Sequence, residues 1–188
     1  MEQRLMQMEE FRKLYDTSMK KHFPPDELKP FSIMEKAVRE GNYFPYGYYE
    51  DGECRAYTCL IKNGDFYLLD YFAVMEDGRG KGTGSRILSI LKGHLSEKEA
   101  VLLEVEEPLA AEPDVRNLQE RRIQFYLRNA AIETGLNAQV FGVRYRILGL
   151  GRPLYEEKAQ TAMETLYHTI LSEEMYERNV RFSLDKPK

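Results

Sequence analysis

The stretch 72–88, FAVMEDGRGKGTGSRIL, contains the residues with the clearest chemistry in the chain. The end of an apolar run and a short acidic turn lead into Arg79-Gly80-Lys81-Gly82-Thr83-Gly84, and an amphipathic segment opens at Ser85. A strand that ends in a glycine-rich turn at the start of a helix is an anion-binding site, because the first N–H groups of a helix lack partners and the helix dipole is positive there. Glycines let the backbone approach a ligand, and Arg79 and Lys81 add positive charge. The pattern predicts a ligand that carries phosphates, and a plain surface turn is the alternative.

The glycine spacing excludes the two best-known phosphate motifs. A P-loop needs GxxxxGK followed by Ser or Thr, and the dinucleotide fingerprint needs GxGxxG within a βαβ unit. Here Gly80, Gly82 and Gly84 are spaced by two and Arg79 precedes the first of them. Neither motif fits.

Three acids on apolar segments could act as proton acceptors. Glu104 and Glu106 alternate in AVLLEVE and therefore share one face of a predicted strand. Asp70 interrupts the apolar run DFYLLDYFAV, where an unpaired buried charge would cost several kcal/mol, an order-of-magnitude figure. A carboxylate can act as a general base, directly or through water. The alternative for Glu104 and Glu106 is a solvated strand face.

Alternating patterns of strands and helices surround these residues. Helical spacing and Gly/Pro signals predict helices that begin near Met8 and end before Pro24, and at 31–40, 84–95, 117–131 and 157–177. Strands are expected at 2–6, 43–49, 53–62, 65–74, 100–106, 137–142 and 143–149, with a break at Gly135. The loop 107–116 separates the fifth strand from the next helix, and the hairpin signals are Asp51-Gly52 and Asn63-Gly64.

Composition limits the class of protein. A chain of 188 residues predicts a single domain over 1–188, with 155–188 as a C-terminal helical extension. The net charge of −4 argues against nucleic acid as a partner. No long apolar run is present, so we expect no membrane partner and a cytoplasmic location. Cys54 and Cys59 fall on opposite faces of a strand, and the histidines, His22, His94 and His168, are far apart and expected at the surface, so we predict neither a disulfide nor a metal site.

The element order and two sequence blocks resemble one family. The order is βααβββαβαββ plus a terminal helix, and Arg-Gly-x-Gly-x-Gly follows the fourth strand. This turn resembles the acyl-CoA motif Q/R-x-x-G-x-G/A of the GNAT N-acetyltransferase superfamily. The resemblance spans about residues 2–150 and is closest over 67–91 and over 102–127, where LEVE is followed by RRIQFY.

The resemblance implies a fold and a cosubstrate. The implied fold is α+β, the GNAT fold, with a mixed central sheet of six to seven strands, splayed fourth and fifth strands, helices on both faces and an extra C-terminal helix. The implied cosubstrate is acetyl-CoA, with no metal. Its binding residues by resemblance are Phe72, Ala73 and Val74 for the pantetheine arm and the thioester, Arg79, Gly80, Lys81, Gly82, Thr83, Gly84 and Ser85 for the pyrophosphate, and Gln119 for the pantetheine arm.

The resemblance also implies direct transfer of an acetyl group to a primary amine of an unidentified small molecule or peptide. Among the acids we rank Glu104 first as the base, Asp70 second and Glu106 third. Tyr126, in the FY of RRIQFY, matches the family's general acid, and a core aromatic residue is its alternative role. The roles of Arg121 and Arg122 stay open.

Departures from the family pattern leave functions other than catalysis as alternatives. Ala130-Ala131 stand where Gly-Phe is common, Gln119 stands where Asn is frequent, and Leu68 replaces a glutamate used by histone-type relatives. These favour a non-catalytic acyl-CoA-binding or interaction module as the alternative. A nucleotide-binding domain is a third reading, based on the turn alone. The charged C-terminal helix could cover the sheet or make a homodimer contact.

Overall fold

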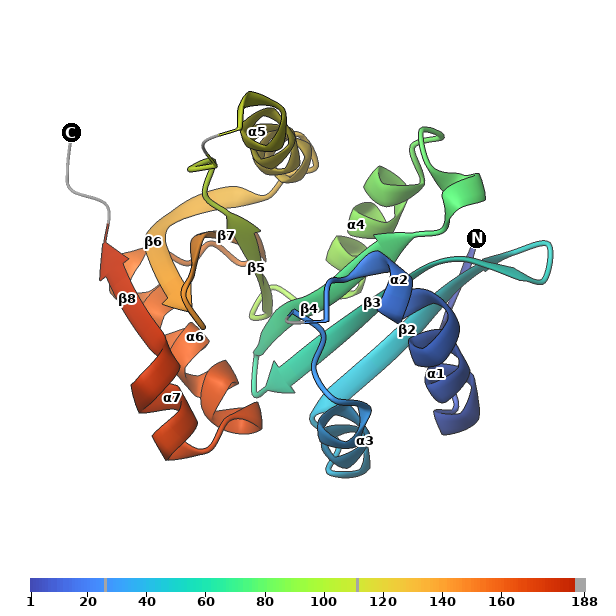
Figure 1. Ribbon diagram of the computed structural model, residues 1–188, viewed down its shortest axis with the longest axis horizontal. Coiled ribbons are helices and arrows are strands. Elements are labelled where there is room, and N and C mark those ends of the chain that lie inside the picture. Colours follow the sequence, from blue (N-terminus) through green and yellow to red (C-terminus); the bar gives the residue numbers. More distant parts are fainter. Residues whose placement is uncertain (26, 111, 185–188) are drawn as a thin grey trace. The chain divides into compact units, whose positions relative to one another are not determined.

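The computed structural model describes residues 1–25, 27–110 and 112–184 (Figure 1). Contacts divide the chain into two compact units. Unit 1 is Met1–Lys62 with Leu69–Ile87, and unit 2 is Asn63–Leu68 with Leu88–Lys188. Two strands and one helix contribute residues to both units. The prediction of a single domain over 1–188 stays a prediction.

From β1 to β7 the main helices and strands follow the predicted order along the chain. The helical segments are α1 (Met8–Leu14), the π-helical turn η1 (Tyr15–Met19), α2 (Lys20–His22), α3 (Phe31–Arg39), the 3-10 turn η2 (Glu76–Gly78), α4 (Thr83–His94), α5 (Pro113–Arg128), α6 (Glu156–Ile170) and α7 (Glu173–Asn179). The strands are β1 (Glu2–Leu5), β2 (Tyr43–Glu50), β3 (Glu53–Asn63), β4 (Phe66–Val74), β5 (Ala100–Glu106), β6 (Ile132–Val140), β7 (Val143–Gly151) and β8 (Val180–Leu184).

The eight strands are paired in the order β1-β2-β3-β4-β5-β7-β6-β8. β1 with β2 and β2 with β3 are antiparallel in unit 1, as are β5 with β7, β7 with β6 and β6 with β8 in unit 2. β4 and β5, joined by α4, run parallel. Residues 66–68 of β4 belong to unit 2 with β5, whereas residues 69–74 belong to unit 1. The α+β GNAT fold and its mixed sheet are therefore confirmed.

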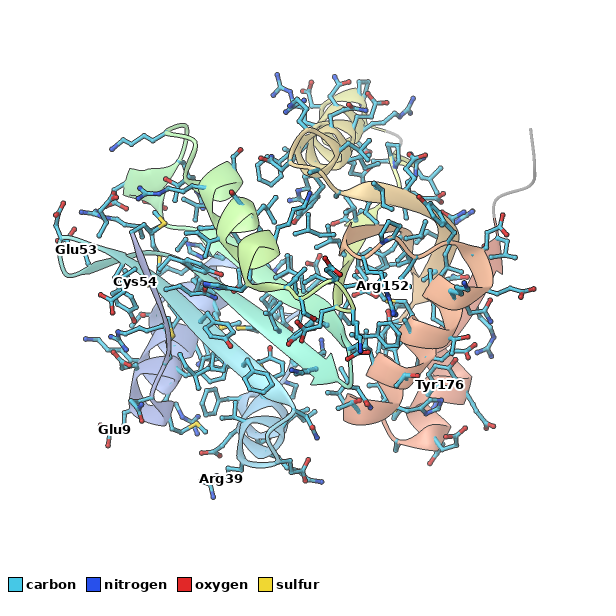
Figure 2. All side chains as sticks on the ribbon, turned by 180° about the vertical axis from the view of Figure 1, so that it is seen from behind. Glu9, Arg39, Glu53, Cys54, Arg152 and Tyr176 are labelled. Carbon is cyan, nitrogen blue, oxygen red and sulfur yellow. The ribbon has the colours of Figure 1, made fainter. Side chains whose placement is uncertain are left out.

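Unit 1 has a core on both faces of its strands. Residues 56–61 of β3 are buried without alternation, which requires cover on both faces. α1 and α3 lie on one face and the beginning of α4 lies on the other (Figures 1 and 2). The helical spacing of α1 and α3 buries Phe11, Phe31 and Met34, so the amphipathic patterns predicted these contacts.

Unit 2 is built in the same way. Ala100–Leu103 of β5 are fully buried, so this strand also has cover on both faces. α5 packs against β5, α6 against β6 and α7 against β8. α6 buries Ala159, Ala162, Met163, Leu166 and Tyr167 along one stripe. The C-terminal segment is therefore a packed part of unit 2.

The first residues of α5 and β6 differ from the sequence prediction. α5 begins at Pro113 rather than at 117, because a proline fits the first turn of a helix, where its missing N–H is not needed. The segment expected to break at Gly135 is a strand from Ile132, and the glycine (φ +76°) lies where the register with β7 shifts between Glu133 and Asn137, as in a β-bulge.

The C-terminal extension contains more than one helix. Ser172 accepts a hydrogen bond from the Met175 amide (3.4 Å) and caps α7, so the helix predicted over 157–177 is divided in two. Val180–Leu184 then form β8, which pairs with β6. This strand brings the sheet to eight strands instead of six or seven.

In the part of the chain that the structure describes, no helix has both the length and the apolar composition to cross a membrane. The cytoplasmic location stays a prediction.

Candidate active site

The glycine-rich turn is shaped by local contacts in unit 1. The Thr83 hydroxyl donates to the Gly78 carbonyl oxygen (3.0 Å), and the Arg79 Nε donates to the Val74 carbonyl oxygen (3.3 Å). Gly80 and Gly82 have φ angles of +75° and +77°, a region that side chains disfavour. A Cβ at either would meet no atom within 4 Å, so these glycines serve the backbone conformation and not close packing.

Gly78 is a turn residue that the sequence motif did not single out. A Cβ placed on it would lie 3.0 Å from Val74 Cγ1 and 3.4 Å from the Arg55 carbonyl oxygen. Gly78 is therefore needed for the turn to pack against the end of the strands. In the sequence, only its spacing of two residues from Gly80 indicated that Gly78 belongs to the turn.

The backbone amides of residues 80–85 face no acceptor in the described chain. Gly78 and Arg79 amides bond to the Met75 and Glu76 oxygens, and the Arg86 amide bonds to Gly82, but no such bond involves the amides between them. α4 begins at Thr83, so its positive dipole end lies at this turn. Arg79 and Lys81 are exposed beside it. The arrangement can bind an anionic group, as the sequence predicted.

The residues expected to hold the pantetheine arm lie at the end of β4. Phe72, Ala73 and Val74 are half-buried in unit 1, and the Met75 amide after them bonds to the Arg55 carbonyl oxygen (2.9 Å). These residues and the glycine turn are one continuous segment of unit 1.

Asp70 is enclosed by partners that the sequence did not reveal. Its side chain is only 3% exposed; Oδ1 lies 2.6 Å from Lys29 Nζ, and Oδ2 accepts a hydrogen bond from the Tyr43 hydroxyl (2.7 Å). Burial and the Asp70 carboxylate raise the pKa of Tyr43 well above its ordinary value, so the phenol stays a donor. A cation and a phenol therefore hold both oxygens of the Asp70 side chain, which favours a structural role.

Asp70 and its neighbour Tyr71 fasten the segment between α2 and α3 to β4. The Tyr71 hydroxyl accepts from the Lys29 amide (2.9 Å) and donates to the Glu27 carbonyl oxygen (2.9 Å). The Phe23 ring packs edge-on against Tyr71 with centroids 4.8 Å apart.

Glu104 lies on β5 and is half-buried in unit 2. Its Oε1 accepts a short hydrogen bond from the hydroxyl of Tyr167 on α6. Tyr167 is 3% exposed and was interpreted only as part of an amphipathic helix. Helical spacing alone could not show that one of its polar atoms reaches this acid, 63 residues away.

The Glu106 carboxylate contacts side chains of α5. Gln119 Nε2 donates to its Oε2 (2.9 Å), and Arg122 Nη1 lies 3.1 Å from its Oε1. Gln119 thus contacts a strand acid and also accepts from the Ala110 amide (3.4 Å). Arg122, whose role the sequence left open, forms an ion pair with Glu106. Arg121 is exposed.

Tyr126 is half-buried near the end of α5. Its ring meets Phe125 edge-on (centroids 5.2 Å apart), and its hydroxyl has no hydrogen-bond partner among the described residues. Burial raises the pKa of Tyr126 to about 12, against a smaller lowering by Arg122. The hydroxyl is therefore protonated at neutral pH, as a general acid must be, and is a weaker acid than free tyrosine.

The Ala130-Ala131 departure falls between α5 and β6. Ala130 has a φ of +65° and Ala131 is buried, with its amide bonded to the Tyr126 carbonyl oxygen (3.1 Å). An alanine in the left-handed region is strained, which explains why glycine is common there.

One histidine differs from the surface expectation. His22 is half-buried; its Nδ1 lies 2.9 Å from the Tyr57 hydroxyl, and the two rings stack with centroids 5.8 Å apart. Burial, helped by Arg79, lowers the pKa of His22. Sequence spacing did not show that α2 turns this ring onto β3.

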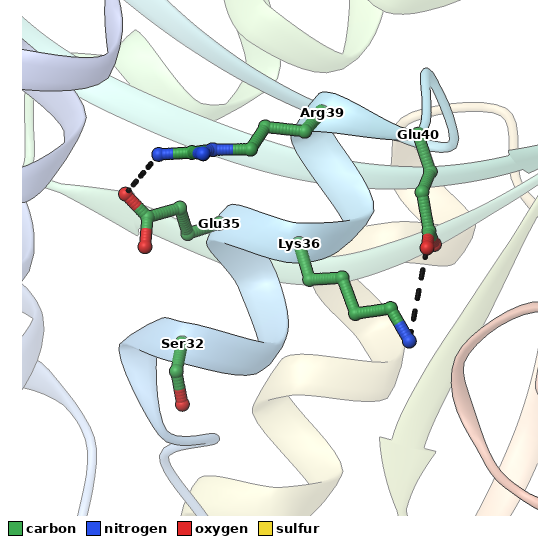
Figure 3. Close-up of a pocket in the computed structure, with 5 residues that line it drawn as sticks. All are labelled: Ser32, Glu35, Lys36, Arg39 and Glu40. Atoms are coloured by element: carbon green, nitrogen blue, oxygen red, sulfur yellow. Dashed lines mark hydrogen bonds and ion pairs between the residues drawn. The ribbon is translucent and has the colours of Figure 1, made fainter.

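A pocket of about 340 Å³ lies on the outer face of α3 (Figure 3). Its lining residues are Ser32, Glu35, Lys36, Arg39 and Glu40. Arg39 pairs with Glu35 (3.3 Å) and Lys36 with Glu40 (3.7 Å), one helical turn apart, and most of the lining is exposed. It contains none of the predicted site residues and has the character of a solvated helix face. Over the described residues, no cluster of three or more His, Cys, Asp or Glu side chains could hold a metal ion.

Comparison with known proteins agrees with the fold described above. The model of the acetyltransferase (GNAT) family matches residues 8–128. "Putative acetyltransferase YjbC" of Bacillus subtilis (strain 168) is 28% identical over 173 residues, covering 84% of this chain and 83% of that protein.

Two solved structures share the fold. One is a "putative acetyltransferase from GNAT family" from Bacteroides thetaiotaomicron, with a TM-score of 0.74 at 23% identity over 90% of this chain and 97% of that chain. The other is an aminoglycoside 6'-N-acetyltransferase complexed with coenzyme A, with a TM-score of 0.60 at 13% identity over 79% of this chain and 96% of that chain. At these identities the likeness shows the fold and not the acceptor.

Proposed function

This chain belongs to the GNAT acetyltransferase family, and on that premise we propose that it is an acetyl-CoA-dependent N-acetyltransferase of a primary amine. The observation that carries the proposal is the row of unpartnered backbone amides at residues 80–85, at the start of α4 and within the segment that the family model matches. The acceptor is a small molecule or a peptide.

The proposed cosubstrate site combines the turn and the strand before it. The amides of residues 80–85 bind the pyrophosphate of acetyl-CoA, with Arg79 and Lys81 as mobile cations. Phe72–Val74 bind the pantetheine arm, and a backbone N–H there polarises the thioester carbonyl. Gln119 is a weaker candidate for the pantetheine arm, since its amide already bonds to Glu106.

The proposed reaction is a direct attack. The amine nitrogen forms a bond to the thioester carbonyl carbon, the C–S bond breaks, and CoA leaves as a thiolate. Glu104 accepts the amine proton, which is needed because an alkyl ammonium with a pKa near 10.4 is almost entirely protonated at pH 7. Tyr126 gives its proton to the thiolate.

The contacts keep Glu104 first among the three acids. Asp70 is held by Lys29 and Tyr43, and Glu106 is paired with Arg122 and Gln119. Glu104 accepts a hydrogen bond from the hydroxyl of Tyr167, a neutral phenol.

The test is a panel of amines with acetyl-CoA and a free-thiol readout. Polyamines, aminoglycosides, amino acids and peptide N-termini form the panel. We expect CoA release that depends on the added amine, and a higher melting temperature with acetyl-CoA or CoA. No thermal shift at millimolar ligand would refute the cosubstrate assignment.

A non-catalytic acyl-CoA-binding module is the second candidate. It is favoured by Leu68, which is fully buried where histone-type relatives have an acid, and by the strained Ala130 after α5. Such a module shows the thermal shift but releases no CoA with any amine of the panel. A preference for ATP over CoA in binding would instead favour the nucleotide-binding reading.

A further inference from the structure

The C-terminal extension reaches the candidate base through one buried tyrosine. Tyr167 lies on α6, outside residues 8–128 that match the family model. Its side chain is 3% exposed, and its hydroxyl donates to Glu104 Oε1. A buried hydroxyl needs a partner, and in the described chain this carboxylate is the partner that the structure gives it.

The ring of Tyr167 is held by the rest of the extension. Its centroid lies 6.4 Å from that of Tyr176 on α7 and 6.1 Å from that of Phe182 on β8. α6, α7 and β8 therefore share in fixing where the hydroxyl points. Figure 2 shows Tyr176 within this group of C-terminal elements.

We propose that Tyr167 is a positioning residue: through it, the C-terminal extension orients the Glu104 carboxylate and sets how readily that group takes a proton. This inference rests on the proposed function, in which Glu104 accepts the proton of the amine. A phenol that donates to a carboxylate fixes one oxygen and favours the ionised form.

Other ionisable groups near β5 are the same in every variant used below. They are Glu106 on β5, Arg122 and Tyr126 on α5, Tyr145 and Arg146 on β7, and Glu164 and His168 on α6. A shift between variants therefore reports the lost Tyr167 hydroxyl.

The experiment compares Tyr167→Phe with Tyr176→Phe in the full chain. Both changes remove one hydroxyl and keep the ring in the same aromatic cluster, but only Tyr167 contacts Glu104. The first readout is a ¹³C NMR titration of the Glu104 side-chain carboxyl, assigned with Glu104→Gln. The second is the pH profile of kcat/KM for the best amine of the panel.

We expect Tyr167→Phe to raise the midpoint of the Glu104 titration by about one pH unit, since a lost hydrogen bond to a carboxylate disfavours the charged form. The acidic limb of kcat/KM should move to higher pH by a similar amount, because the base works only when ionised. Tyr176→Phe should leave both unchanged.

The outcomes separate this inference from the proposed function. An unmoved Glu104 midpoint in Tyr167→Phe, with the fold intact by thermal melting, would overturn the inference whether or not the protein is active. If the Glu104 midpoint moves but the pH profile of kcat/KM does not, the contact stands, and the claim that Tyr167 influences catalysis through Glu104 (the catalytic half of the inference) is overturned. If the wild type releases no CoA with any amine, the proposed function fails, and the catalytic half fails with it, while the NMR titration still decides the contact.

Discussion

The turn at residues 80–85 in unit 1 and the strand β5 in unit 2 offer different kinds of functional group: backbone amides in the turn and side-chain carboxylates on the strand. The turn offers backbone amides that have no partner in the described chain, and its shape depends on glycines with positive φ. β5 offers carboxylates whose side chains have partners on other elements: Glu106 contacts Gln119 on α5, and Glu104 contacts Tyr167 on α6, 63 residues away. Binding groups made of backbone depend on local conformation, whereas catalytic side chains depend on which distant residues surround them.

The largest expected effect tests the side-chain region. Glu104→Gln should lower kcat by about 10³, because an amide cannot accept the amine proton and general bases contribute about 10²–10⁴. Steady-state CoA release with the best amine measures it. Glu106→Gln, on the same face of the strand, is the matched control and should cost less than about tenfold; a reversed ranking would make Glu106 the base.

Tyr126→Phe should have the next largest effect. We expect kcat to fall by about 10², since the thiolate loses its proton donor, with the affinity for CoA nearly unchanged. Turnover assays and calorimetric titration with CoA measure the two quantities. Lost CoA affinity, or a lower melting temperature, would instead identify Tyr126 as a structural aromatic residue.

The backbone region is tested by Gly82→Ala. A side chain at φ +77° is strained by about 1–2 kcal/mol, so the turn should lose its shape and CoA affinity should fall about tenfold. Gly41→Ala is the matched control, because Gly41 also has φ +77° and open space around its Cβ. It should cost similar stability in denaturant unfolding and leave CoA affinity unchanged. Equal losses of affinity in both variants would contradict the role of the turn.

The smallest effect on turnover is expected from Asp70→Asn. The change removes the ion pair with Lys29 on a side chain that is 3% exposed, so the free energy of unfolding should fall by about 2 kcal/mol while kcat changes less than about threefold. Urea unfolding and turnover measure these. Asp65→Asn, an exposed acid just before β4, should stay within about 0.5 kcal/mol. A large loss of kcat with intact stability would restore Asp70 as the base.

The amino-acid sequence by itself determined the element order through β7, the strand–turn–helix at residues 72–88 and the candidate acids. These follow from hydrophobic periodicity and from glycine spacing, which act over a few residues. It did not determine which side chains surround each acid. Asp70 meets Lys29 across 41 residues and Glu104 meets Tyr167 across 63, and no local pattern encodes such pairs. Only the packing of α6 and of the segment before α3 decided that one carboxylate is held by a cation and the other by a phenol, because long-range contacts are set by the whole core and not by any one segment.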